Sequence, residues 1–94
     1  MNQIERIRLM EEKMEEAAAL LSNAREAPET LAMGRPLFEV LAAYLHSPQW
    51  LADYAADEEG LLPPTLKRGV LSQDGLYNLL TEYEALKPFL PQKP

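Results

Sequence analysis

The N-terminal part of the chain carries a helical repeat that limits the folds the chain can adopt. Over residues 2–23, apolar side chains recur at alternating spacings of three and four residues. The repeat consists of Ile7, Met10, Met14, Ala17, Leu21 and Ala24. Because such spacing places side chains on one face of a helix, we expect a helix over 2–23. We expect the apolar stripe of this helix to pack inside its own domain. The alternative is that it packs against a second copy of the chain and forms a homo-dimer through the segment from Ile7 to Leu21.

Prolines mark where two further helices change direction or begin. An apolar stripe continues over 29–46, but Pro36 interrupts it, because proline lacks the backbone donor and clashes with the preceding turn. We therefore expect this helix to be kinked near residue 36, or a new helix to begin there. Ser47 suits an N-cap and Pro48 suits the first helical position, which predicts a short helix over 48–59.

A proline-rich loop and a last helix follow. Gly60 suits the left-handed position that ends a helix, and we expect the two leucines after it to hold a loop over 60–71 to the core. Ser72 suits the N-cap of a helix over 72–87, whose leucines follow helical spacing.

These segments together predict the fold class as all-α, a compact bundle of about four helices. No strand-like alternation interrupts them. The chain of 94 residues fits one domain over 1–94. We expect its last residues, 88–94, to form a loosely ordered tail.

Composition and charge exclude several classes of function. The absence of cysteine excludes disulfides, thiolate nucleophiles and cysteine-bound metals, and it fits a reducing compartment. A formal charge of −6 repels nucleic-acid phosphates and anionic lipids. Charged residues precede any apolar stretch at the N-terminus, and the longest purely apolar run is far shorter than a membrane span. We expect a cytoplasmic protein that binds neither nucleic acid nor a membrane.

A basic turn, Lys67, Arg68 and Gly69, stands out in this acidic chain. The arginine fork beside a glycine is suited to bind a carboxylate or a phosphate. The same cations could instead pair with acidic residues of the preceding helix, Asp53, Asp57 or Glu58, and so hold a loop that the glycine lets turn sharply. We favour the structural role and keep the binding role open.

The remaining candidate residues do not form a catalytic set. Asp53 and Asp57 lie one helical turn apart and could share a cation, but most such pairs are only solvated, so we expect no metal. Ser72 is explained as an N-cap, and no base accompanies it. We therefore expect no cofactor and a protein that is not an enzyme. Trp50 and Tyr77 are suited either to the core or to a binding hot spot, and Tyr77 lies off its helical stripe, where it could face the basic turn.

A long segment of the chain resembles a known family. The segment "YLHSPQWLADYAADEEGLLPPTLKRGVLSQDGLYNLL", from Tyr44 to Leu80, contains a Ser-x-x-Trp, a Leu-Pro, a Leu-Lys-Arg-Gly-Val-Leu-Ser and a Tyr-x-Leu-Leu pattern. It is similar to a family of small bacterial proteins classed as a domain of unknown function. The resemblance implies a bacterial source, and it assigns no activity.

The sequence thus favours a non-enzymatic protein-interaction module. The candidate binding residues are Trp50, Asp53, Lys67, Arg68, Gly69 and Tyr77. One alternative is an accessory protein that binds a small ligand or anion through the Lys67–Arg68 turn. A further alternative is a self-associating structural protein that uses the stripe from Ile7 to Leu21.

Overall fold

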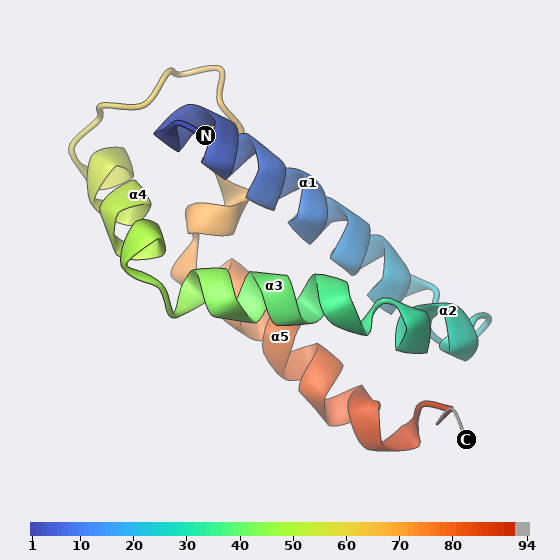
Figure 1. The fold of residues 1–94 in the computed structure, drawn as a ribbon. Helices are drawn as coiled ribbons and strands as arrows, with labels where there is room; N and C mark the ends of the chain where they lie inside the picture. The colour runs from blue at the N-terminus through green and yellow to red at the C-terminus, as the bar shows by residue number, and fades with distance from the viewer. Residues whose placement is uncertain (92–94) are drawn as a thin grey trace.

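The computed structural model describes residues 1–91, and its regular structure there is entirely helical (Figure 1). The helices are α1 (Gln3–Ser22), α2 (Pro28–Met33), α3 (Arg35–Leu45), α4 (Pro48–Glu58) and α5 (Gln73–Leu86), with single 3-10 turns η1 (Gly69–Leu71) and η2 (Lys87–Phe89). The chain packs into a bundle of 45 × 24 × 23 Å. The all-α prediction is confirmed. Of the predicted tail 88–94, residues 92–94 lie outside the described part.

Helix α1 forms where the apolar repeat predicts it. Asn2 caps it, because its side chain accepts a hydrogen bond from the Glu5 amide at 2.9 Å and donates one to the Glu5 carboxylate at 2.8 Å. Ile7 and Ala17 are completely buried, and the other apolar residues of the repeat pack against the core. The stripe is therefore used within the chain's own domain.

The segment 29–46 forms two helices instead of one kinked helix. The interruption falls at Gly34, which ends α2 and precedes α3. Pro36 then occupies the first turn of α3, where a missing backbone donor costs nothing. A proline can begin a helix at this point but cannot continue one, so of the two expected outcomes the structure has the new helix and not the kink.

Helix α4 is capped at both ends as expected. The Ser47 hydroxyl accepts a hydrogen bond from the Trp50 amide at 3.2 Å. At the other end, Gly60 has a φ of +70°, and the amide of Leu61 donates to the Ala56 carbonyl at 2.9 Å. This is a Schellman C-cap, whose left-handed residue favours glycine.

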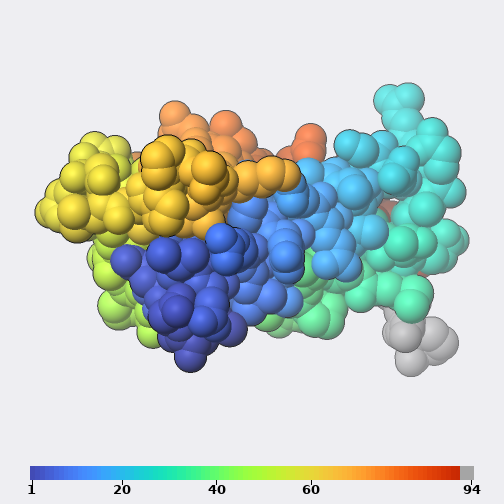
Figure 2. Space-filling view, turned by 90° about the horizontal axis from the view of Figure 1, so that it is seen from above, coloured from blue at the N-terminus to red at the C-terminus, as the bar shows by residue number. Residues whose placement is uncertain are grey.

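The loop after α4 lies along α1, where Figure 2 shows the two segments in contact. Leu62 and Leu66 are buried and fix the loop to the core. Leu61 is 69% exposed, so the expectation that it also anchors the loop is wrong. Its backbone completes the helix cap, and this geometry directs the side chain outward.

Helix α5 runs across α3 and closes the core (Figure 1). Ser72 caps it as predicted, since its hydroxyl accepts a hydrogen bond from the Gly75 amide at 3.3 Å. The rings of Phe38 on α3 and Tyr83 on α5 stack with centroids 3.9 Å apart and planes within 4° of each other. This stack joins α3 to α5.

Candidate functional site

Trp50, a predicted binding residue, lies inside the molecule. Its side chain is 5% exposed, and its indole N–H donates to the Val70 carbonyl at 3.1 Å. The Tyr54 ring, one turn further along α4, stacks on it at 5.1 Å. Almost all of the tryptophan surface therefore contributes to the packing of α4 against η1.

Asp53 is fully buried and accepts four hydrogen bonds. Arg6 of α1 binds it in a bidentate manner, with distances of 2.9 Å from Nε and 2.5 Å from a terminal nitrogen. The Tyr44 hydroxyl donates at 2.7 Å and the Gln3 amide at 3.0 Å. Burial alone would raise the pKa of Asp53, but these donors outweigh it and hold the pKa below its usual value.

The same network acts on its two titratable donors. The hydrogen bond to Asp53 raises the pKa of Arg6, which therefore stays charged. Burial, together with the hydrogen bond to Asp53, raises the pKa of Tyr44. We call Gln3, Arg6, Tyr44 and Asp53 the buried network. It joins α1, α3 and α4 at one end of the molecule.

Arg68 of the basic turn is engaged by three acceptors. Its guanidinium donates to the Asp57 carboxylate at 2.6 Å, to the Pro63 carbonyl at 2.7 Å and to the Leu66 carbonyl at 3.4 Å. It thus fastens the loop to α4, in agreement with the structural role weighed for it. Lys67 points elsewhere: its side chain is 76% exposed, and its amine lies 3.2 Å from the Glu15 carboxylate.

Gly69 has a different role from the expected one. Its φ is not in the left-handed region, so the turn itself does not need glycine. A Cβ at this position would lie 3.2 Å from Oε2 of Glu11, whose other oxygen accepts a hydrogen bond from the Val70 amide at 2.8 Å. Glycine here lets the Glu11 carboxylate approach the backbone closely.

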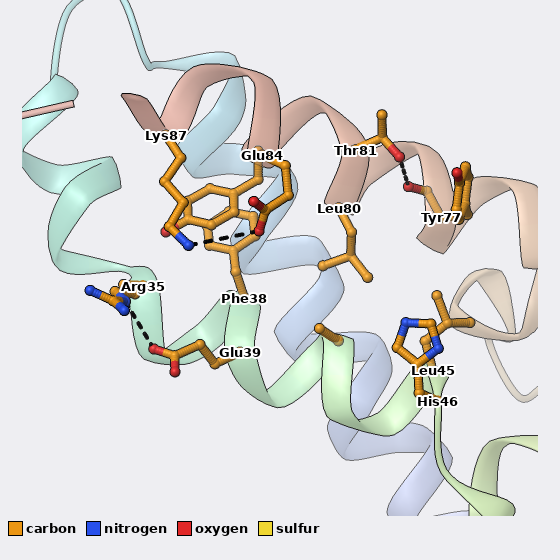
Figure 3. Close-up of a pocket in the computed structure, with 12 residues that line it drawn as sticks. Arg35, Phe38, Glu39, Leu45, His46, Tyr77, Leu80, Thr81, Glu84 and Lys87 are labelled. Carbon is orange, nitrogen blue, oxygen red and sulfur yellow. Dashed lines mark hydrogen bonds and ion pairs between the residues drawn. The ribbon is translucent and has the colours of Figure 1, made fainter. Parts of the chain in front are cut away.

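Tyr77 is the predicted site residue whose large apolar ring remains exposed to solvent. Its side chain is 59% exposed. It lines a groove between α3 and α5 and not the basic turn, so the expectation that it faces the turn is wrong (Figure 3). The register of α5 explains this result, because Leu76 and Leu79 point into the core and rotate Tyr77 toward α3.

This groove, which we call the α3–α5 groove, has a volume of about 330 Å³. Its floor consists of Phe38, Ala42, Leu45, Leu80 and Tyr83. The floor residues are buried or half-buried, whereas charged and polar side chains on its rims are mostly exposed. The lining residues follow helical spacing on both helices, so the groove runs between two rows of side chains, one on each helix.

Two ion pairs lie on the rims of the α3–α5 groove (Figure 3). On α3, Arg35 lies 3.2 Å from Glu39, and both side chains are more than 60% exposed. At the end of α5, Lys87 lies 4.0 Å from Glu84. Between them, burial raises the pKa of the Tyr83 phenol, a shift that the nearby charge of Arg35 opposes.

With the fold and these contacts established, comparison with known proteins places the chain in a family. The family model for a domain of unknown function, DUF4298, matches residues 7–90. The chain belongs to this family. The match extends from the first half of α1 to just beyond η2, and it confirms the family that the resemblance indicated. No curated protein and no solved structure matches the chain significantly.

In this DUF4298 protein, most residues that carry the resemblance have a packing or capping role. Ser47 and Ser72 cap helices, and Trp50 and Leu66 are buried. Tyr77 differs from the other aromatic residues between positions 44 and 80, which are buried or half-buried. Its exposed ring adjoins the apolar lining of the groove, and contiguous exposed apolar surface of this kind is typical of interaction sites.

A second, smaller crevice of about 230 Å³ lies between α1 and the loop of this DUF4298 protein. Its cations are Arg8 and Lys67, and its anions are Glu11, Glu12 and Glu15. Because carboxylates outnumber cations there, the crevice is poorly suited to an anion. Within residues 1–91, no three histidine, aspartate or glutamate side chains converge as metal ligands would. None of the helices described has the length and apolar character needed to cross a membrane.

Sequence reasoning found one of the two ion pairs at the α4 end and missed the partner in the other. It weighed the pairing of Arg68 with Asp57, which forms, but it did not find Arg6 as the partner of Asp53. Arg6 lies 47 positions from Asp53, and nothing local in the sequence signals that distance. The α3–α5 groove was missed as well, although the off-stripe position of Tyr77 was its one visible signal.

Proposed function

We propose that this DUF4298 protein is a non-enzymatic protein-interaction module that binds a helical segment of a partner protein in the α3–α5 groove. The observation that supports this proposal most directly is the apolar floor of the groove beside the exposed ring of Tyr77. Three other predicted binding residues make their contacts within the chain, namely Trp50, Asp53 and Arg68.

The shape of the groove favours a helix as its occupant. Two rows of side chains spaced by one turn border it, and a third helix can place residues i, i+3 or i+4 and i+7 between such rows. Helix α3 has 11 residues. At about 1.5 Å per residue it offers a length of roughly 16 Å, which is about three turns of a bound helix.

Tyr77 is suited to be the anchor of this contact. Tyrosine combines a large apolar ring with a hydroxyl and is enriched among the residues that dominate binding energy. Ordering its ring costs little conformational entropy, because only two side-chain torsions are fixed. Leu80 and Ala42 on the floor would then contact the apolar side chains of the partner.

The basic turn supports a binding role less well. Three protein acceptors already occupy Arg68, so a ligand would have to displace Asp57 and two carbonyls. Lys67 is exposed, but it lies among the glutamates of α1. For these reasons the proposed site differs from the turn that the sequence suggested, and it retains Tyr77.

Affinity capture with two matched tryptophan variants tests the proposal. Thr81→Trp fills the α3–α5 groove from its rim, whereas Asn78→Trp adds the same side chain to an exposed position of α5 that does not line the groove. We expect a partner identified with the wild-type protein to be lost with Thr81→Trp and retained with Asn78→Trp. A partner that survives Thr81→Trp but is lost with Lys67→Ala would move the site to the basic turn and refute the proposal.

A further inference from the structure

The two glutamates on the rims of the α3–α5 groove indicate the chemistry of its partner. Resting on the proposed function, we infer that the bound segment is a positively charged amphipathic helix of another protein. Its apolar face lies on the groove floor, and its lysines or arginines pair with Glu39 and Glu84.

The position of these glutamates supports the inference. Glu39 belongs to α3 and Glu84 to α5, so one carboxylate stands on each side of the apolar floor. Their side chains are 64% and 65% exposed. A helix lying in the groove would therefore have an acidic group beside each of its flanks, which is the charge pattern that a basic amphipathic helix complements.

The present partners of these glutamates are easily replaced. Arg35 and Lys87 come from the same helix segments as the glutamates, at spacings of four and three residues. Such exposed local pairs are weak and are screened by solvent. A cation of the partner can therefore take over either glutamate while Arg35 or Lys87 turns into solvent.

The charge of the surroundings favours the same sign of partner. Among the residues that line the groove, two acidic side chains (Glu39 and Glu84) balance two basic ones (Arg35 and Lys87). Asp74 and Glu82, elsewhere on α5, give α3, α5 and Lys87 together a net charge of −2. The whole chain has a formal charge of −6. This field attracts a basic segment and repels an acidic one, and it disfavours a second copy of the same chain as the occupant.

Two synthetic peptides provide the probe. Each has roughly 14 residues, which is about four helical turns, with leucines at helical spacing on one face. One carries lysines on its flanks, and its twin carries glutamates at the same positions. Isotope-labelled protein is titrated with each peptide, amide shifts are mapped by NMR, and affinity is measured by calorimetry at low and moderate salt.

We expect the lysine peptide to shift amides around the α3–α5 groove and the glutamate peptide to leave them unchanged. The double variant Glu39→Lys/Glu84→Lys should weaken the lysine peptide about tenfold, since two attractive pairs become repulsive. Glu16→Lys is the control for single charge reversal, because Glu16 is exposed on α1 and does not line the groove. It should change affinity clearly less than Glu84→Lys alone.

The possible results separate the inference from the proposed function. Equal binding of both peptides in the groove would overturn the charge inference and leave the proposed function standing. Shifts spread over the acidic face of α1, with equal sensitivity to Glu16→Lys and Glu84→Lys, would overturn it as non-specific attraction. The absence of any groove shift with the lysine peptide would overturn it too, and the Thr81→Trp capture would then decide separately whether the groove binds a partner.

Discussion

The α4 end of the molecule and the α3–α5 groove both contain carboxylate–cation pairs, but the two regions use them in opposite ways. The Asp53 side chain is fully buried and accepts four hydrogen bonds. Glu84 is 65% exposed and lies 4.0 Å from a single lysine. The contrast shows that burial and the number of donors, and not the type of residue, decide whether an acidic side chain holds the fold or remains available to a partner.

Distance along the chain separates the two regions in the same way. Arg6 and Asp53 are 47 positions apart, so their contact fixes α1 against α4. Arg35 and Glu39 are four positions apart, so their contact stabilises only the helix that contains both. A contact between distant segments cannot be exchanged without opening the fold, whereas a contact within one helix can be.

The largest expected effect comes from removing the buried carboxylate of Asp53, with removal of the exposed carboxylate of Glu84 as the comparison. Asp53→Ala leaves Arg6 and the Tyr44 hydroxyl without their shared acceptor inside the protein. Removing one partner of a buried ion pair costs about 3 to 5 kcal/mol of unfolding free energy. We expect a loss of about 3 kcal/mol, because the Arg6 side chain is 23% exposed and can reach solvent. Denaturant unfolding followed by circular dichroism measures the change.

Glu84→Ala is the matched variant for this prediction. Because both members of its ion pair are exposed, the free energy of unfolding should change by less than about 0.5 kcal/mol. Similar losses in Asp53→Ala and Glu84→Ala would remove the distinction between the two regions.

An intermediate effect is expected within the basic turn, where neighbouring cations differ in burial. Arg68→Ala removes the donor of the Asp57 carboxylate and of the Leu66 carbonyl and leaves the Pro63 carbonyl with the Leu66 amide alone, which should cost about 1 to 2 kcal/mol. Lys67→Ala should cost only about 0 to 0.5 kcal/mol, because its amine and Glu15 are both more than half exposed. If the lysine variant were the less stable of the two in thermal unfolding, the structural role assigned to Arg68 would be wrong.

The sequence was informative wherever a local pattern determines the structure. The apolar repeat from Ile7 onward, the serine caps and the left-handed Gly60 each depend on neighbours within one or two turns, and each formed as predicted. At Pro36 the pattern allowed either a kink or a new helix, and only the structure decides for the new helix. The local error was Leu61, whose backbone completes the cap of α4 while its side chain is exposed.

Contacts between distant segments were out of reach of the same reasoning. The sequence allowed Arg68 to pair with Asp53, Asp57 or Glu58, but the choice of Asp57 depends on how the loop docks. The pairing of Asp53 with Arg6 depends on how α1 docks, and no local pattern indicated it. The α3–α5 groove likewise arises from the crossing of two helices whose apolar stripes looked complete in the sequence. Only the position of Tyr77 outside its stripe indicated a surface beyond the core.

The smallest expected effect concerns acid pH and belongs to the buried network alone. The pKa of Asp53 lies below its usual value in the folded protein, whereas in the unfolded chain it returns to about 3.9. The unfolded chain therefore takes up a proton first as the pH falls, and the stability contributed by Asp53 is present above about pH 4 and is lost as the pH falls through the folded pKa. In Asp53→Asn, the free energy of unfolding should decline less steeply below about pH 5, by at most one proton or about 1.4 kcal/mol per pH unit. Tyr44→Phe, which removes one of three donor side chains, should fall between this variant and the wild type. Parallel curves for all three proteins in urea unfolding at successive pH values would show that the buried network does not keep Asp53 ionised, and the contrast with the groove would then depend on burial alone.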